Sequence, residues 1–305
     1  MENDNYTHRQ EALIENAKKQ VENAYKHTNE KSFGTRHAYM ESSKRFVTHV
    51  ASTWSLQNMK NVRNEHIQSY VNELKEDDCT AAYIKTELSG IRHLLHIIGS
   101  KNNIYATNDR FGIPKRESEV LPGMTREEYL KARGLAEDKF GAEGRITVDL
   151  QYYFGLRINE TQAVRVKRFV DATNTGILHL DSCDGTKGGR PRDVKVETIE
   201  QLTVIKEALE YKNKQGKSFS DRLLTDRTKG AVHRSKHGYQ KMYAENADLL
   251  SDKSSHDLRR SFAQSVYDRI PGTDKDKMRE VCKSLGHGAN RDDITARYVA
   301  NRWAK

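Results

Sequence analysis

Along the first hundred residues, apolar positions recur at helical spacing between charged ones. One such stretch covers residues 6–29, and three further segments begin near Thr35, Asn64 and Thr80. Apolar residues at i, i+3, i+4 and i+7 give each segment one apolar face. Gly99 follows the last segment, in the position where a glycine commonly ends a helix. The pattern predicts a helical N-terminal part whose segments pack through these faces.

The helical period is lost between Ser100 and Gly123, a stretch that holds two of the four prolines of the chain. Loss of periodicity together with proline is typical of a connecting segment. We therefore expect a linker at residues 101–123. It would separate a helical extension (1–30) and a helical domain (31–100) from a second domain (124–305).

Helical patterning resumes after Met124, where Thr125 and Glu128 have the spacing of a capping box. Two short apolar runs, residues 176–182 and 192–198, flank the glycine-rich stretch CDGTKGGRP, which is turn chemistry for a hairpin. The remainder is again helical in pattern. The expected fold is mainly α with a small β-sheet, and the second domain is of the α+β class.

Composition adds a partner class to this picture. The chain has 305 residues with 35% hydrophobic content, enough for two domains with real cores. Lysine and arginine number 52 against 43 acidic residues, giving a net charge of +9 and favouring a polyanionic partner. Many soluble proteins are mildly basic, so charge alone does not decide whether the partner is a nucleic acid.

Neither a membrane span nor a signal peptide is expected, because apolar runs are short and the N-terminus is polar. The three cysteines, Cys79, Cys183 and Cys282, lie far apart and form no CxxC pair. This spacing suggests neither a disulfide framework nor a zinc site. The expected location is a reducing one, the cytoplasm, in association with the nucleoid.

Several polar residues stand out, although each has an ordinary interpretation by itself. The ordinary interpretations are a helical ion pair, a solvated turn lysine, a common H-x-x-R spacing, a histidine at a helix end and a core tyrosine. The residues in question are Arg157, Glu160, Lys187, His256, Arg259, His287 and Tyr298.

Taken in order, these residues form one set. The motif GLRINE, a lysine in a hairpin turn, HDLRR, LGHG and a tyrosine near the end resemble the tyrosine recombinase (phage integrase) family. Residues 31–100 are similar to the helical, SAM-like core-binding domain of that family, and residues 124–305 to its catalytic domain. The resemblance implies a site-specific DNA recombinase or integrase that moves a mobile element.

The resemblance also implies roles. A DNA phosphodiester repels nucleophiles, and its leaving alkoxide needs a proton, so a catalyst must supply positive charge and an acid. The implied nucleophile is Tyr298, which would form a 3′-phosphotyrosyl link. The supporting residues would be Arg157 and Arg259 on the phosphate, His256 as proton acceptor or hydrogen-bond donor, Lys187 as general acid for the 5′-oxygen, His287 on the phosphate, and Glu160 behind them. Neither a metal, a cofactor nor ATP is required.

The implied partner is double-stranded DNA at specific core or attachment sites. Four protomers would exchange strands through a Holliday junction, and the free protein would be a monomer or weak oligomer. Basic residues expected on the DNA backbone are Lys44, Arg45, Lys85, Arg92, Arg190 and Arg192. Trp303 is expected to anchor the tail, either on its own protomer or on the next.

The interval from His256 to His287 is longer than the family's usual spacing, and the excess falls in a loop between two helices. The interval from His287 to Tyr298 is also a little longer, which slightly weakens the assignment of His287. Two alternatives stay open. One is a type IB topoisomerase-like enzyme, which would nick and relax any DNA. The other is a catalytically silent DNA-binding regulator that has kept the fold.

Overall fold

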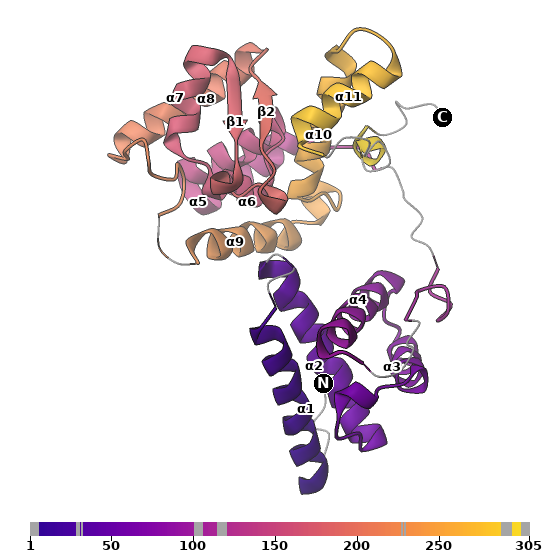
Figure 1. The fold of residues 1–305 in the computed structure, drawn as a ribbon. Helices are drawn as coiled ribbons and strands as arrows, with labels where there is room; N and C mark the ends of the chain where they lie inside the picture. The colour runs from indigo at the N-terminus through magenta and orange to yellow at the C-terminus, as the bar shows by residue number, and fades with distance from the viewer. Residues whose placement is uncertain are drawn as a thin grey trace. The chain divides into compact units, whose positions relative to one another are not determined.

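The chain divides into two compact units, Met1–Glu117 and Ser118–Lys305. The computed structural model describes residues 6–28, 31, 33–100, 106–114, 121–226, 228, 230–287 and 295–299. Both units are predominantly helical (Figure 1).

The first unit is a bundle of four α-helices. They are α1 (His8–Lys26), α2 (Phe33–Trp54), α3 (Asn64–Glu76) and α4 (Ala81–Ile98), with a single 3-10 turn η1 (Met59–Asn61) before α3. Thr7 and Thr80 cap α1 and α4 with their side chains, and Gly99 ends α4 with a φ of 63°. The core combines apolar residues of all four helices, including Val21, Phe46, Ile67 and Leu88.

Residues 106–114, which we expected to lie within the linker, pack onto this first unit. Ala106, Phe111 and Ile113 are buried in its core. The backbone of the segment is held from the helices: the Lys75 ammonium donates to the Phe111 carbonyl at 2.9 Å, and Arg92 donates to that of Ala106. The limits of the expected domains and linker stay predictions.

The second unit contains seven α-helices and one hairpin within the described residues. The helices are α5 (Arg126–Phe154), α6 (Ile158–Ala163), α7 (Val166–Thr175), α8 (Ile199–Lys214), α9 (Ala231–Glu245), α10 (Ser255–Arg269) and α11 (Asp274–Leu285). The strands are β1 (Ile177–Leu180) and β2 (Arg192–Lys195), and the single 3-10 turns are η2 (Ser182–Asp184), η3 (Lys187–Gly189), η4 (Asp248–Leu250) and η5 (Ala296–Tyr298). The predicted mainly α fold with a small hairpin is confirmed.

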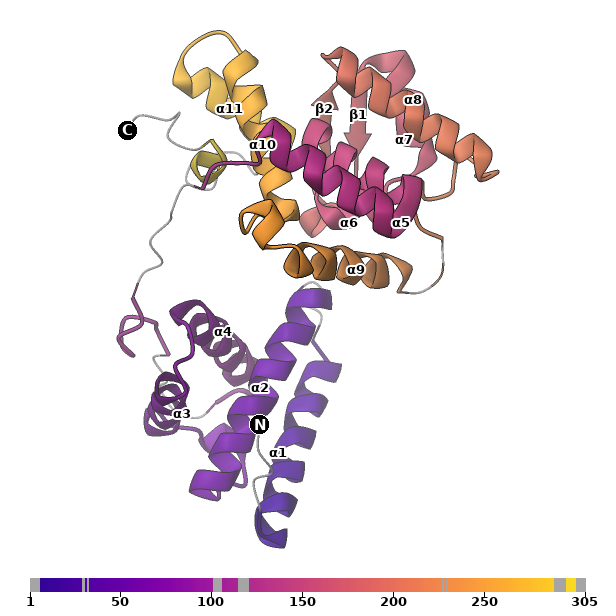
Figure 2. The same cartoon turned by 180° about the vertical axis from the view of Figure 1, so that it is seen from behind.

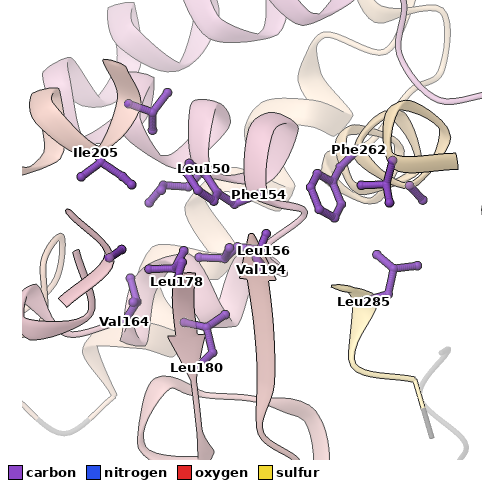
Figure 3. Packing of buried hydrophobic residues seen from close by; sticks show 14 of the residues in the cluster. Leu150, Phe154, Leu156, Val164, Leu178, Leu180, Val194, Ile205, Phe262 and Leu285 are labelled. Carbon is purple, nitrogen blue, oxygen red and sulfur yellow. The ribbon is translucent and has the colours of Figure 1, made fainter. Parts of the chain in front are cut away.

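The hairpin is antiparallel, with Ile177 opposite Lys195 and Leu180 opposite Arg192. Its side chains alternate between buried and exposed, so one face turns to the core. There Leu178, Leu180 and Val194 meet apolar residues of α5 and α8 such as Leu150 and Ile205 (Figure 3). Seen from behind, α5 and α8 cover this side of the strands (Figure 2). The hairpin is thereby fixed to the core through one face.

Among the described residues, none of the helices combines the length and the apolar character that a membrane crossing requires.

Helices α2 and α4 approach closely at Gly90. A Cβ atom there would lie 2.6 Å from the Ser42 Cβ and 3.1 Å from the Tyr39 carbonyl oxygen. Real Cβ atoms do not approach another carbon so closely, so any side chain would push the two helices apart. Gly90 therefore allows the close contact of α4 with α2, although glycine lowers the stability of a helix interior.

We predict that Gly90→Ala destabilises the first unit by about 1–2 kcal/mol, because the overpacking outweighs the gain in helix propensity. Urea denaturation of the full chain measures the change. Gly34→Ala is the control: nothing lies within 4 Å of a Cβ at Gly34, so this variant should be at least as stable as the wild type. Equal stability of both variants would show that the close approach is unimportant.

Candidate active site

The turn between α5 and α6 supplies the first part of the site. Gly155 adopts a φ of 59°, and a Cβ on it would lie 2.3 Å from the Phe262 ring, so only glycine fits. Its carbonyl accepts hydrogen bonds from two guanidinium groups, Arg192 at 3.2 Å and Arg259. The motif FGLRINE thus builds a tight turn whose backbone oxygen gathers two arginines.

A buried carboxylate, that of Glu160, lies at the centre of the site. Its side chain has no exposed surface, and Arg157, the N-cap residue of α6, donates to it through the backbone N–H at 2.8 Å and the guanidinium at 2.7 Å. Arg192 donates to the same carboxylate at 2.7 Å. The Arg259 guanidinium lies 3.8 Å away. Three positive side chains from α6, β2 and α10 therefore surround one negative charge.

The pKa values reflect this imbalance. Burial alone would raise the pKa of Glu160, but the charges of Arg192, Arg259 and Arg157 outweigh it and hold the pKa at about 2. Burial lowers the pKa of Arg259 to about 9, and the neighbouring Arg192 and Arg157 charges act in the same direction. Both groups are charged at neutral pH, so positive charge is in excess.

Two buried donors reinforce the same point. The Nε atoms of Arg192 and Arg259 have no hydrogen-bond partner among the residues that the structure describes. Buried donors without partners are costly, and an anion bound at Arg259 would satisfy the one on that residue.

The end of α11 completes the support of the arginines. Arg259 donates to the carbonyl of Leu285, and Arg192 to that of Ser284, so the guanidinium groups cap the last carbonyls of this helix. Gly286 follows with a φ of 64°, and a Cβ there would lie 2.7 Å from the Arg192 side chain. The first glycine of LGHG is thus required for both the turn and the contact.

His287 comes directly after this glycine and is held by Thr295. The His287 Nδ1 atom lies 2.8 Å from the hydroxyl of Thr295, which also lies 2.8 Å from the Cys282 sulfur. Thr295 is fully buried. The threonine hydroxyl therefore orients the imidazole through Nδ1.

Tyr298 lies in the middle of these groups and is 8% exposed. Its ring centre is 5.2 Å from that of His256, 5.1 Å from that of His287 and 6.0 Å from the Arg259 guanidinium carbon. The Gln264 side chain donates to its backbone carbonyl at 3.1 Å. The structure therefore brings the candidate nucleophile to the candidate base and phosphate ligands within one unit.

His256 begins α10 and has an exposed edge. Partial burial lowers its pKa to about 4, and the charges of Arg260 and Arg259 add to this, while Asp257 opposes it. The imidazole is consequently neutral at pH 7 and can accept a proton.

Lys187 lies outside this cluster. It is exposed in η3, on the turn between the strands, and none of its contacts in the described structure reaches the arginines or Tyr298. Arg190 is exposed on the same turn. The structure thus brings together six of the seven candidate residues, and Lys187 lies on an exposed turn.

The expectation that Arg192 contacts the DNA backbone does not fit the structure. Its side chain is 1% exposed and its guanidinium is directed to Glu160 and to the carbonyls of Gly155 and Ser284. Arginine pairs with a buried carboxylate here because it supplies several donors in one plane.

The other expected backbone contacts in the first unit already have partners. Lys44 pairs with Glu22 at 2.9 Å, Arg45 binds the buried Glu87 at 2.6 Å, and Arg92 donates to the Ala106 carbonyl and the Ser89 hydroxyl. Lys85 donates to the carbonyl of Pro114. A role on DNA stays a prediction for these four residues.

The sequence alone did not identify the contact of Thr295 with His287 or the burial of Arg192 beside Glu160. Thr295 carried a weak signal, its place one helical turn before the tyrosine. Arg192 carried none, since its pairing with Glu160 spans 32 residues. Trp303, the expected tail anchor, lies outside the described residues.

Comparison with known families gives two matches. A model described as phage integrase, N-terminal, matches residues 16–104, and one described as integrase matches residues 127–265. No curated protein matches the chain.

Solved structures share the fold at low identity. A lambda integrase dimer bound to a COC′ core site matches with a TM-score of 0.64 and 18% identity, covering 94% of this chain and 97% of that one. A lambda integrase tetramer bound to a Holliday junction gives 0.63 and 18%, covering 94% and 79%. The Tn1549 transposon integrase in complex with transposon right end DNA gives 0.61 and 12%, covering 94% and 96%.

Together the two family models account for most of both units. The chain therefore belongs to the phage integrase, or tyrosine recombinase, family of site-specific DNA recombinases.

Proposed function

We propose that this recombinase cleaves DNA with Tyr298 and rejoins it through a 3′-phosphotyrosyl intermediate. The observation that carries the proposal is the position of Tyr298, whose ring lies beside His256, His287 and Arg259. A phenol is mostly protonated at neutral pH and needs an acceptor and a positive field to attack a phosphate. The neutral His256 and the arginine cluster supply both.

In the cleavage step, the Tyr298 oxygen attacks phosphorus while its proton passes to the His256 imidazole. The bond from phosphorus to the 5′-oxygen breaks, and Lys187 gives a proton to that oxygen. Rejoining reverses the step with a different 5′-hydroxyl, so the phosphotyrosyl bond conserves the energy of the original linkage.

Arg157 and Arg259 are the proposed ligands of the non-bridging phosphate oxygens. Their planar donor groups can bind the oxygens of an anionic phosphate. The attraction between these positive charges and the phosphate increases as negative charge develops in the transition state. His287, oriented by Thr295, would donate to the same phosphate. Glu160 and Arg192 would hold the two arginines in place.

The proposed partner is double-stranded DNA at paired core sites, bound by four protomers that exchange strands through a Holliday junction. The net charge of +9 and the family membership support a DNA partner. The lambda integrase structures, a dimer on a core site and a tetramer on a junction, show such assemblies for that protein. We place the activity in the cytoplasm, at the nucleoid.

The first prediction concerns the nucleophile. On a nicked suicide substrate that carries its cognate core site, the wild type should accumulate a covalent protein–DNA adduct, detected as a shifted band on a denaturing gel. Tyr298→Phe should form none, because it keeps the ring contacts and lacks the attacking oxygen.

Tyr267→Phe is the matched control, since Tyr267 is a buried tyrosine of α10 whose hydroxyl binds Asp274 at 2.7 Å. It should still form the adduct. An adduct from Tyr298→Phe would show that another residue attacks. Relaxation of any supercoiled plasmid without exchange between sites would favour a topoisomerase, and a wild type without adduct would favour a silent regulator.

The second prediction concerns Glu160. Glu160→Gln should lower the free energy of unfolding by about 3–5 kcal/mol, because it leaves buried arginine charges uncompensated. Urea denaturation at pH 7 measures the loss. Glu245→Gln removes the charge of an exposed partner of Lys139 and should cost less than about 1 kcal/mol. Similar losses for both would mean that the buried carboxylate does not stabilise the arginines.

The third prediction concerns pH. His256 has a folded pKa of about 4 against an ordinary 6.5, and Glu160 one of about 2 against 4.5. As pH falls, the unfolded chain takes up these protons before the folded one. Stability is therefore lost between pH 6.5 and 4 through His256, and between 4.5 and 2 through Glu160.

Thermal unfolding of the wild type and of His256→Asn between pH 7 and 5 checks the histidine contribution. The variant should lose less of its melting temperature over this range than the wild type. Parallel curves would show that the imidazole is not held neutral in the folded protein.

A further inference from the structure

We propose that Asp184 and Arg168 are positioning residues for Lys187. They tie the base of the turn that carries this lysine to α7, and that base packs on α6, whose N-cap residue is Arg157. The inference rests on the proposed role of Lys187 as the acid for the leaving 5′-oxygen.

Asp184 lies in η2, ahead of Lys187, and has no exposed surface. Its carboxylate accepts hydrogen bonds from the Arg168 Nε at 2.8 Å, from the backbone N–H of Arg165 at 3.3 Å and from that of Asp181 at 3.0 Å. One buried side chain thus ties η2 to the start of α7 and closes the turn on itself.

Arg168 and Thr186 complete this base. The Arg168 guanidinium, largely buried, also pairs with the Asp181 carboxylate. The Thr186 hydroxyl donates to the Asp181 carbonyl at 3.0 Å, so the residue directly before Lys187 is held as well. We call residues 181–186 the turn base.

The turn base packs directly on α6. Gly185 adopts a φ of 76°, and a Cβ on it would lie 3.0 Å from the Asn159 carbonyl oxygen and 3.0 Å from the Ala163 Cβ. Helix α6 begins at the N-cap residue Arg157 and carries Glu160. The base of the lysine turn and the arginine proposed to hold the phosphate are therefore positioned by the same short helix.

Beyond Thr186 the turn closes on itself, since the Gly189 N–H donates to the Thr186 carbonyl at 3.1 Å. Lys187 to Arg190 are exposed, and Gly188 and Gly189 each have a φ of 69°. Around Gly188 a Cβ would meet nothing within 4 Å. The chain is fixed again at Arg192, whose side chain is buried at Glu160. Lys187 thus lies on a short, exposed arc between two fixed ends, and these ends limit where its ammonium group can go.

The position of the fixed ends thus determines whether the Lys187 ammonium can meet the leaving oxygen. A displacement of about 1 Å at a reacting group can cost on the order of 100-fold in rate. Loss of the Asp184 contacts should therefore slow proton donation specifically, while nucleophilic attack, which depends on the arginines and Tyr298, proceeds.

Single-turnover cleavage by the full chain on two substrates tests this inference. One is an ordinary core-site DNA, and the other has sulfur in place of the bridging 5′-oxygen at the cleaved position, a leaving group that needs no proton. We expect Asp184→Asn to slow cleavage of the oxygen substrate by about 10–100-fold and to leave the sulfur substrate near the wild-type rate. Asp193→Asn, at an exposed residue of β2, should change neither rate.

Equal slowing of both substrates by Asp184→Asn would overturn the inference, since it would indicate a purely structural role, and so would unchanged cleavage of both. If circular dichroism shows that Asp184→Asn does not fold, Arg168→Lys is tested on the same two substrates. This variant keeps the positive charge but cannot contact Asp181 and Asp184 at the same time. Lys187→Ala distinguishes a failure of this inference from a failure of the proposed role of Lys187. If Lys187→Ala slowed both substrates equally, the acid would lie elsewhere, whatever Asp184 does.

Discussion

The geometry of the catalytic unit depends on one buried carboxylate that organises three arginines. Glu160 binds Arg157 and Arg192 directly, and Arg259 lies within ion-pair distance. These arginines come from α6, β2 and α10, and two of them also cap the end of α11 through the carbonyls of Ser284 and Leu285. Burying so many charges is unfavourable unless each is paired or hydrogen-bonded. The four elements are therefore held where those pairings are possible, and the cluster keeps an excess of positive charge, which we propose binds the phosphate.

Around this centre lie the groups that we propose to transfer protons and to form the covalent bond. Tyr298 contacts its neighbours through ring edges and one backbone hydrogen bond from Gln264. Lys187 projects from an exposed turn. Such a division suits a reaction in which the phosphate must stay fixed while the nucleophile and the acid approach and withdraw.

The sequence predicted the helical segments well, because apolar periodicity reports directly on which face of a helix is buried. It also predicted the hairpin, since turn residues and short apolar runs are local signals. Motif order identified Arg157, Glu160, His256, Arg259, His287 and Tyr298, which the structure brings into one cluster. The sequence did not predict the interaction of Arg192 with Glu160, nor the packing of Phe111 and Ile113 into the first unit. Both are long-range contacts, and a charged or apolar residue in a loop carries no local mark of its partner. For the same reason Lys44 and Arg45 were expected to be available to DNA, whereas each has an acidic partner on another helix.

Helix α6 connects the two halves of the proposed reaction. It has only six residues, Ile158–Ala163, yet Arg157 caps its start, Glu160 gathers the arginines, and the backbone of Asn159 and the side chain of Ala163 support Gly185 in the turn base. A helix this short has little intrinsic stability, so its position is set by the buried contacts on either side. The phosphate ligands and the lysine turn therefore share one support. In the proposed reaction, this shared support would keep the attacked phosphorus and the acid within the distance that the Lys187 side chain can cover.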